Sequence, residues 1–464
     1  LPFLEEIPLS PAVLLFTLAV SAGTGAFFGL LPILRHRRRA VVNALKQGGR
    51  RGAAAVDGRG AQNSLAVSQL ALAVVLLIAS GLMLRSFQSI RNMNPGFRNP
   101  GGVLAIRISI PSQEIREPAE MARAHELIAR RLAELPGVTS VGMGTGIPMD
   151  GWSNVNPFYV DGATPQGSGP PPIRRHKWIG EGYFETLQIP LLAGRAFTWQ
   201  DIHNRFPGAV LSESLAREYF GSPEAALGQR VAARPDPPRW HEVVGIAADV
   251  RDDGLGLDPI KEVYWPQVTL AFWEGQAADR VATWRGMGYA IRSDRVGTSG
   301  FVEEIRDVVR SVNPNLPLTG VRTLQELMAQ STARTSFAMV LMGIAAGVAF
   351  FLGVVGVYGV ISYGISMRAR EIGVRMALGA RQGDVRGMVL RQGLMLSGIG
   401  VAIGLFLAFA LTRFMEGLLF GVSPVDPMTY LAAAAGLSGT ALLAGYLPAR
   451  RAASIDPITV LRAE

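Results

Sequence analysis

The residue types that most often carry chemistry do not occur here at the spacings that chemistry requires. A P-loop needs a lysine directly after a glycine, and none of the three lysines, Lys46, Lys177 and Lys261, follows one. No serine stands in a G-x-S-x-G context, and the absence of cysteine excludes thiolate metal sites and cysteine nucleophiles. We therefore predict that the chain is not an enzyme and holds no cofactor.

Three other groups of residues match binding motifs only in part. Four histidines lack an H-x-x-x-H or H-x-x-E-H spacing, so we predict no metal site; they are His125, His176, His203 and His241. Four aspartates do not follow the EF-hand pattern and are interpreted as an exposed turn; they are Asp249, Asp252, Asp253 and Asp258. Gly142, Gly144 and Gly146 lack the G-x-G-x-x-G spacing and are also interpreted as a turn.

The most informative polar segment, 367–392, reads MRAREIGVRMALGARQGDVRGMVLRQ. Glu371 and Arg375 are four residues apart, so on a helix they would form an ion pair. Gly379 can end that helix in the left-handed conformation, and Asp384 can cap a second helix that follows.

The first of these helices would be short and amphipathic, with Ile372 and Met376 presented to a groove. A helix of this kind, held between two membrane spans, is a suitable lever. A helix that rests on lipid beside a positively charged loop fits the pattern equally well.

The elements that would position this segment are uncharged stretches long enough to form membrane-spanning helices. There are five of them, each at least 21 residues long. They cover 11–34, 64–84, 335–367, 392–412 and 427–449. A helix of 21 residues is about 31 Å long, enough to cross a hydrocarbon core of roughly 30 Å. Hydrophobic residues make up 49% of the chain and charged residues only 17%, which argues against a disordered or wholly soluble protein. We predict an α-helical membrane protein with five transmembrane helices.

Basic residues between the stretches set the orientation. The segment 35–63 contains eight basic residues and one acid, Asp57, and 368–391 contains six basic residues and two acids, so both are predicted to be cytoplasmic. Residues 85–334 are then extracytoplasmic. The net charge of +9 is mostly explained by this topology, so we expect contact with membrane lipid and no nucleic-acid partner. Because the five stretches hold no ionisable residue, an ion-coupled secondary transporter is disfavoured.

The first and last stretches look like copies of one another. At an offset of 416 residues both contain Gly-Thr, at 23–24 and 439–440, and both end in Leu-Pro, at 31–32 and 447–448. We interpret 1–48 as the last span of a first half, 49–63 as a flexible cytoplasmic linker and 64–464 as a second half. The six glycines of 335–367 indicate either a packing face or the general tolerance of membrane helices for glycine.

The extracytoplasmic segment is predicted to be an α+β domain. A β-α-β unit is expected from a strand at 103–110, a helix at 117–135 and a strand at 138–142, and a second from 288–292, 300–312 and 316–321. A helix from Thr323 would lead into the membrane. Shorter elements lie between, with strands at 209–211 and 242–246 and a helix at 215–220. We expect one lobe built from both ends of the segment and a second lobe built from its middle.

Two motifs give the chain a resemblance to a known family. The sequence REIGVRMALGA at 370–380 and PARRAASIDPITVLR at 448–462 resemble the FtsX/MacB class of ABC-transporter permeases, as does the order of one span, a large external domain and three spans. The segment 1–48 resembles the end of a first half in tandem-duplicated permeases of this class that lack a fused ATPase, found in bacteria such as acidobacteria.

The resemblance implies a domain order and a cellular location. The first span of the second half would be 64–90, a MacB-like periplasmic core domain 91–334, with a porter-like lobe, and an FtsX-like three-span permease domain 335–464. The protein would lie in the bacterial inner membrane.

The resemblance also implies a coupling helix that docks on a separate ABC ATP-binding subunit. Its residues are Arg370, Glu371, Ile372, Gly373, Arg375, Met376, Ala377, Leu378, Gly379 and Ala380. ATP binding would shift the spans and move the external domain, as in efflux or mechanotransmission. Further implied partners are a second permease half or copy and a periplasmic adaptor. The class acts on macrolide-like drugs, peptides, lipoproteins or cell-wall enzymes, and the sequence does not distinguish these. The alternative function is a membrane-anchored scaffold or sensor without ATPase coupling.

Overall fold

A computed structural model describes residues 15, 16, 18, 19, 53–162, 171–234, 239–270, 272, 280–378 and 381–453, with the side chains of some residues inside helices excepted. The chain divides into two compact units. One unit comprises Leu1–Ser89 and Thr335–Glu464, and the other comprises Ile90–Arg334.

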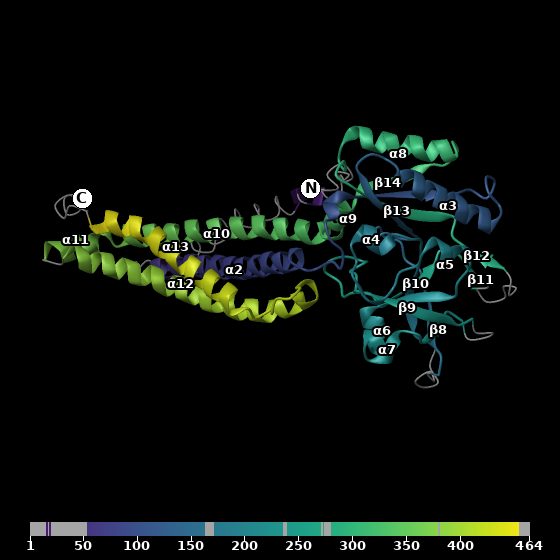
Figure 1. The fold of residues 1–464 in the computed structure, drawn as a ribbon. Helices are drawn as coiled ribbons and strands as arrows, with labels where there is room; N and C mark the ends of the chain where they lie inside the picture. The colour runs from purple at the N-terminus through teal and green to yellow at the C-terminus, as the bar shows by residue number, and fades with distance from the viewer. Residues whose placement is uncertain are drawn as a thin grey trace. The chain divides into compact units, whose positions relative to one another are not determined.

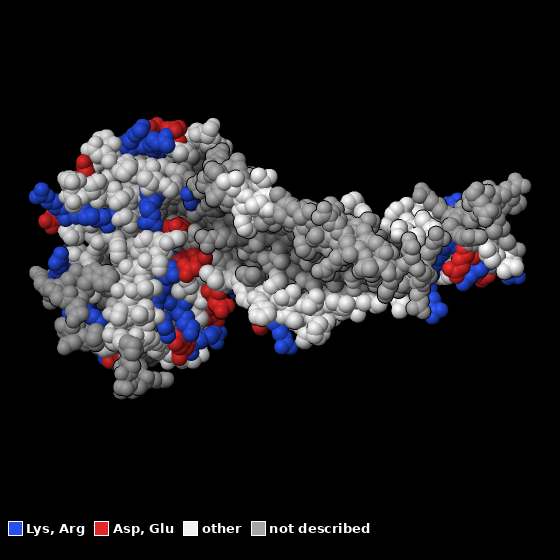
Figure 2. Space-filling model, turned by 180° about the vertical axis from the view of Figure 1, so that it is seen from behind, with Lys and Arg blue, Asp and Glu red and all other residues white. Residues whose placement is uncertain are grey.

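Long helices form the first unit (Figure 1). They are α2 (Ala53–Arg91), α10 (Ala333–Met367), α12 (Gln382–Thr412) and α13 (Pro427–Ala453), with the short α11 (Ala369–Ala377) between α10 and α12 and the 3₁₀ helix η2 (Arg413–Leu418) after α12. On the face drawn in Figure 2, charged side chains lie toward the ends of these helices, and the described surface between them is white. The described part of this face can therefore lie against hydrocarbon.

Four of these helices are long and apolar enough to span a membrane, where the sequence predicts five spans. The four cover Asn63–Arg91, Thr335–Met367, Gln382–Gly417 and Pro427–Arg450. Four of the predicted stretches lie within them and are confirmed as helices, whereas the span predicted over 11–34 lies almost wholly outside the described residues. Part of the predicted flexible linker is helical instead, because α2 already begins at Ala53, where three consecutive alanines favour helix.

Helix α2 packs against α12 at two glycines one turn apart, Gly400 and Gly404. A Cβ atom built on Gly404 would lie 2.6 Å from Val74 Cβ, and one built on Gly400 would lie 2.7 Å from Leu70 Cβ. Two helices can approach this closely only where one of them has no side chain, as in the small-xxx-small pattern of membrane helices. This glycine pair brings α2 and α12 together.

The glycines of α10 form a packing face only in part. Gly353 and Gly356 face α2, where Cβ atoms would lie 3.4 Å from Leu70 Cδ2 and 2.3 Å from Gln69 Oε1. Around Gly347 and Gly359, by contrast, no atom of the described structure lies within 4 Å of such a Cβ atom. Gly353 and Gly356 are therefore the two α10 glycines that pack closely on α2.

The extracytoplasmic unit is built on one mixed sheet. The strand order is β14-β1-β13-β2-β5-β10-β7-β9-β8-β4, with β3 paired to β5 and β6 paired to β9. The strands are β1 (Val103–Ser109), β2 (Val138–Gly144), β3 (Val155–Pro157), β4 (Tyr159–Val160), β5 (Ile173–Ile179), β6 (Leu191–Gly194), β7 (Gly208–Ser212), β8 (Arg230–Ala232), β9 (His241–Ala247), β10 (Glu262–Pro266), β13 (Gly286–Ser293) and β14 (Leu318–Thr323). Strands β11 (Thr269–Leu270) and β12 (Val281–Ala282) pair separately.

Both ends of the segment build one lobe, as the sequence predicts. Strand β13 lies between β1 and β2 and is antiparallel to both, and β1 lies in the same way between β13 and β14. The crossover helices α3 (Pro118–Ala133) and α8 (Ser299–Val312) complete two interleaved β-α-β units, the ferredoxin-like arrangement. Alternation along β1 places Leu104, Ile106 and Ile108 under α3 and α8.

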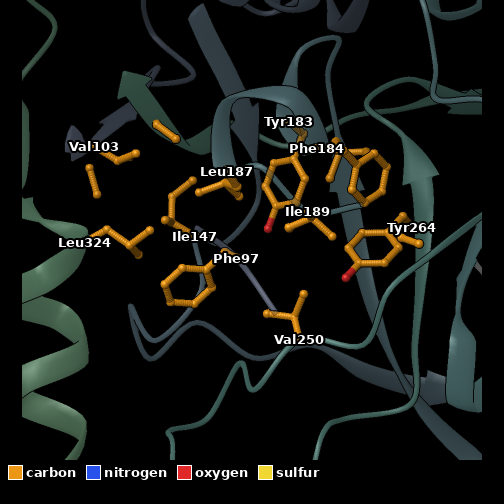
Figure 3. Close-up of a cluster of buried hydrophobic side chains, with 14 of the residues drawn as sticks. Phe97, Val103, Ile147, Tyr183, Phe184, Leu187, Ile189, Val250, Tyr264 and Leu324 are labelled. Carbon is orange, nitrogen blue, oxygen red and sulfur yellow. The ribbon is translucent and has the colours of Figure 1, made fainter. Parts of the chain in front are cut away.

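The middle of the segment builds the second lobe. Its helices are α4 (Tyr183–Leu187), α5 (Trp199–His203), α6 (Glu213–Phe220) and α7 (Pro223–Ala226). Only one residue pair, Gly144 with Ile179, joins β2 of the first lobe to β5 of the second. A shared core of side chains lies where the lobes meet (Figure 3), and it includes Tyr183 and Tyr264. The two lobes therefore share a hydrophobic core but only one pair in the strand ladder.

Two interpretations from the sequence are wrong. Gly142 and Gly144 belong to β2 and not to a turn. Glycine is found at position 142 because the start of α4 packs so closely that a Cβ atom there would lie 2.6 Å from the carbonyl oxygen of Gly182. Asp252 is not in an exposed turn, because it is 4% exposed and forms an ion pair with Lys177. In both cases a contact between distant segments overrides the local pattern.

Three buried histidines of this unit are neutral. Burial lowers the pKa of His125 to about 4, of His176 to about 3 and of His241 to about 4. His125 Nδ1 lies 2.7 Å from the hydroxyl of Tyr289, and His176 Nδ1 accepts a hydrogen bond of 2.9 Å from Trp265 Nε1. Neutral imidazoles fit these contacts, because His176 Nδ1 can accept only when it carries no proton.

We expect a single added methyl group at Gly404 to destabilise the helical unit. Gly404→Ala inserts a Cβ atom against Val74, which should cost about 1–3 kcal/mol. Gly398→Ala is the matched control, because the same change on the same helix meets no described atom within 4 Å and raises helix propensity equally. Unfolding of both variants in detergent, followed by circular dichroism, checks this. Equal stability of the two variants would contradict the close α2–α12 contact.

We also expect the extracytoplasmic unit to lose stability in acid. The folded-state pKa values of the three histidines lie below the value of about 6.5 in the unfolded chain, so their contribution is complete above pH 6.5 and is lost as the pH falls toward 4. At pH 5 the loss is about 2 kcal/mol per histidine. All seven tryptophans lie between positions 152 and 284, so urea unfolding followed by tryptophan fluorescence reports on this unit alone. A midpoint that is equal or higher at pH 5 than at pH 7.5 would contradict the prediction.

Candidate functional site

The cytoplasmic segment forms two helices, as the sequence predicts. Helix α11 covers Ala369–Ala377, and α12 begins at Gln382. Asp384, in the first turn of α12, accepts a hydrogen bond of 3.2 Å from the backbone N–H of Arg381, so this carboxylate caps the start of the helix. The predicted ion pair is present, with Arg375 donating to Glu371 Oε1 at 2.5 Å.

Helix α11 is anchored by the residue that the sequence assigns to a partner groove. Ile372 is 1% exposed and lies in a small cluster with Val385 at the start of α12. Ile365 of α10 and Met376 of α11 pack against the same cluster. The expectation that Ile372 faces outward is therefore wrong, because the apolar face of α11 covers the first turn of α12.

The exposed face of α11 carries other residues. Val374 is 41% exposed and Leu378, which follows the last turn, is 83% exposed. Glu371 and Arg375 are about half exposed, and Arg375 also approaches Met388 Sδ of α12 at 3.5 Å. Two apolar side chains four residues apart, beside an ion pair, form a small amphipathic surface. Gly379 and Ala380 lie outside the described residues, as do the side chains of Arg370, Gly373 and Ala377.

At the other end of the helical unit, α2 is fastened to the connection between α12 and α13. Arg85 of α2 forms an ion pair with Asp426, which also accepts a hydrogen bond of 2.8 Å from the backbone N–H of Thr429 and so caps α13. Ser86 Oγ accepts a hydrogen bond of 2.9 Å from the backbone N–H of Phe420. The connection 413–426 is therefore at the end of α2 from which the chain enters the extracytoplasmic unit.

Two segments of the extracytoplasmic unit continue into membrane helices, and both are fixed in its core. Residues 92–102 follow α2 and insert Phe97 into the shared core, and α9 (Leu324–Ser331) precedes α10 and inserts Leu324 and Leu327 (Figure 3). Thr323 and Glu326 form a capping box at the start of α9. Both chain connections to the membrane helices therefore start from the core between the lobes.

The loop that follows β9 holds the first of these segments. A Cβ atom on Gly96, whose φ is +90°, would lie 2.2 Å from the carbonyl oxygen of Asp249, so only glycine fits there. The backbone N–H of Arg251 donates to the carbonyl of Pro95 at 3.0 Å. Sequence reasoning missed this attachment, although the Asn-Pro-Gly turn at 94–96 is a local signal for it.

Sequence reasoning also missed the glycine pair of α12 and the ion pair between Arg85 and Asp426. Gly400 and Gly404 lie in an uncharged stretch with many other glycines, and nothing local distinguishes the two that touch α2. Arg85 and Asp426 are 341 positions apart, so only the folded chain brings them together. Their one signal is their position at the ends of two predicted spans.

Both units contain residues that match profiles of known protein families. Residues 63–297, about half of the chain, match the family profile described as MacB-like periplasmic core domain, and residues 343–457 match the one described as FtsX-like permease C-terminal. The macrolide export ATP-binding/permease protein MacB of Hyphomonas neptunium is 29% identical over 303 residues, which cover 61% of this chain and 43% of that protein. MacB of Chromobacterium violaceum is 27% identical over 348 residues, which cover 70% of this chain and 50% of that protein.

The periplasmic region of MacB from Actinobacillus actinomycetemcomitans aligns with a TM-score of 0.34 and 18% identity over 51% of this chain and 95% of that region. The chain spans about half the length of the curated relatives it matches. The periplasmic core profile precedes the permease profile along this chain. The chain therefore belongs to the FtsX/MacB-like family of ABC-transporter permeases, inner-membrane proteins with an extracytoplasmic domain.

Proposed function

We propose that this chain is the permease part of an ABC-type efflux or mechanotransmission complex. Membership of the FtsX/MacB-like family supports this, as does the arrangement of long apolar helices with one extracytoplasmic unit between the first and the second. ATP would be hydrolysed by an ATP-binding subunit, and the permease would convert that subunit's closure into movement outside the membrane.

The observation that carries the proposal is the anchoring of α11. A lever must be fixed to what it moves and must expose a surface to what moves it. Ile372 fixes α11 to α12 through Val385, and Val374 and Leu378 remain exposed. We infer that these two side chains enter an apolar groove of the ATP-binding subunit, with Glu371 and Arg375 as polar contacts at its rim.

A continuous path of contacts supports transmission from this helix. Helix α11 packs on the start of α12, and α12 packs on α2 at Gly400 and Gly404. Helix α2 then continues covalently to Phe97 in the core between the lobes. A shift of α11 would reach the extracytoplasmic unit without any solute passing between the helices.

The domain order belongs to the same proposal. Residues 1–48 would be the last span of a first permease half, 49–63 a linker, 64–90 the first span of the second half, 91–334 the MacB-like core domain and 335–464 the FtsX-like permease domain. A second permease half or copy, a periplasmic adaptor and lipid would complete the assembly.

We expect a charge on the exposed face of α11 to release the ATP-binding subunit. Leu378→Glu and Val374→Glu each place a carboxylate in the inferred groove, which should lower the ATPase activity that copurifies with the full chain in detergent by at least about tenfold. Gln382→Glu is the matched control, because it adds the same charge at an exposed position on the same side of the membrane. Undiminished ATPase recovery with both groove variants would refute docking through α11 and favour a scaffold.

A charge swap separates docking from helix stability. Glu371→Arg alone breaks the pair with Arg375 and should abolish association with the ATP-binding subunit. Adding Arg375→Glu restores a pair of opposite charges on α11 in reversed order, so the helix regains most of the few tenths of a kcal/mol that the pair contributes. We expect the double variant to remain deficient in copurifying ATPase. Full recovery would mean that Glu371 acts only within the helix.

A further inference from the structure

A buried cluster of charges in the extracytoplasmic unit has no role in the path described so far. Lys177 of β5 is 1% exposed at its side chain, and its Nζ atom lies 2.8 Å from Asp252 Oδ1 and 3.3 Å from Glu262 Oε1. The same ammonium donates to the hydroxyl of Tyr183 at 3.2 Å. The carboxylates of Asp252 and Glu262 are 4% and 2% exposed. Three ionisable groups thus meet away from water.

Further charged and titratable groups surround them. Arg175 of β5 lies 3.3 Å from Asp252 and 2.9 Å from Asp253, and Arg107 of β1 pairs with Asp150 at 2.7 Å, near Asp252. Tyr264 of β10 hydrogen-bonds the Glu262 carboxylate, and the rings of Tyr183 and Tyr264 lie 5.8 and 5.9 Å from Lys177 Nζ. From β7, Ser212 Oγ accepts a hydrogen bond from the backbone N–H of Glu262. These groups come from β1, β5, β7, β10 and the loops that hold Asp150 and Asp252.

The charges of the cluster do not balance. Lys177 with Asp252 and Glu262 leaves one excess negative charge, and adding the pair of Arg175 and Asp253 leaves the same excess. An uncompensated charge in a buried site is strongly disfavoured, so such a group takes up a proton. The carboxylates therefore compete for one proton.

Glu262 is the carboxylate that should hold this proton. Burial raises the pKa of Asp252 as well, but this carboxylate accepts hydrogen bonds from both Lys177 and Arg175, which oppose the rise. Glu262 Oε1 lies 3.3 Å from Lys177 Nζ, whereas Asp252 Oδ1 lies 2.8 Å from it. Burial raises the pKa of Glu262 to about 7, against the opposing effect of Lys177. Burial lowers the pKa of Lys177, but the two carboxylates raise it well above its usual value, so the lysine stays charged.

We propose that Glu262 binds one dissociable proton and thereby makes the joint between the lobes and the membrane-connected segments sensitive to the pH outside the cytoplasm. The charged cluster is connected to this joint through the backbone beside Asp252. The carbonyl of Asp252 accepts a hydrogen bond of 2.8 Å from the backbone N–H of Met149, and the backbone N–H of the neighbouring Arg251 donates to the carbonyl of Pro95. Loss of the proton leaves an uncompensated charge beside the loop that holds Gly96. The ligand is a proton, and the response is a change in stability of this joint.

The sign of the effect follows from linkage. The pKa of Glu262 is higher in the folded chain than in the unfolded chain, so the folded state gains stability from the proton, and this gain is lost as the pH rises through 7. The three buried histidines act in the opposite direction, so the contribution of Glu262 must be isolated by a variant. Glu262→Gln keeps the shape of the protonated form and does not titrate.

The first experiment compares urea unfolding of the full chain and Glu262→Gln in detergent between pH 5 and 8, followed by tryptophan fluorescence. The unfolding constant of the wild type relative to Glu262→Gln should rise about 70-fold from pH 5 to pH 8. Glu242→Gln, at an exposed position on β9 in the same lobe, is the matched control and should show a constant ratio to the wild type. A constant ratio for Glu262→Gln as well would overturn the proposal.

The second measurement needs no variant. Infrared spectra of the full chain in D₂O should contain a protonated carboxyl band that disappears with a midpoint near pH 7. Labelling with ¹³C-glutamate should shift this band, which assigns it to glutamate and not to Asp252. A chain with no carboxyl band titrating between pH 6 and 8, or with a band that the label does not shift, would refute protonation of Glu262.

Discussion

The close contact between α2 and α12 at Gly400 and Gly404 is the packing constraint on which the proposed transmission through α2 depends. Helix α12 begins beside α11 at the cytoplasmic segment, and α2 leads into the extracytoplasmic unit. At Gly404 the helices are so close that not even a methyl group fits without a shift. Lipid offers apolar side chains almost no gain from association, so close backbone packing of this kind must supply the attraction.

The extracytoplasmic unit receives both membrane connections in one place. Phe97 and Leu324 lie in the shared core at the boundary of the lobes, where a single residue pair continues the sheet. A boundary with so little strand pairing can yield to movement more easily than the sheet of either lobe. The buried cluster at Lys177 lies beside this boundary and is balanced only when Glu262 carries a proton. Packing and charge together therefore set how firmly the lobes are joined.

Much of this fold could be predicted from local pattern. Uncharged stretches identified four helices, and period-two alternation identified β1, β13 and the end lobe, because hydrophobic periodicity survives in any environment that buries one face. The Glu371–Arg375 pair was also predictable, because helix geometry alone brings positions four apart together. Contacts between distant segments were not. The face of Ile372 could not be chosen without α12, and four aspartates within ten positions gave no sign that Lys177 would bury one of them.

We propose that events at α11 move the lobes of the extracytoplasmic unit. The chain has no cysteine, so Ser311→Cys on α8 and Glu224→Cys on α7 allow a spin label to be placed on each lobe without background. The distance between the labels would be measured by pulsed electron paramagnetic resonance spectroscopy in the complex with the ATP-binding subunit, first without nucleotide and then with ATP and vanadate. We expect this distance to change on nucleotide binding in the wild type and to stay unchanged in Leu378→Glu. An unchanged distance in a wild-type complex that hydrolyses ATP would contradict the proposal.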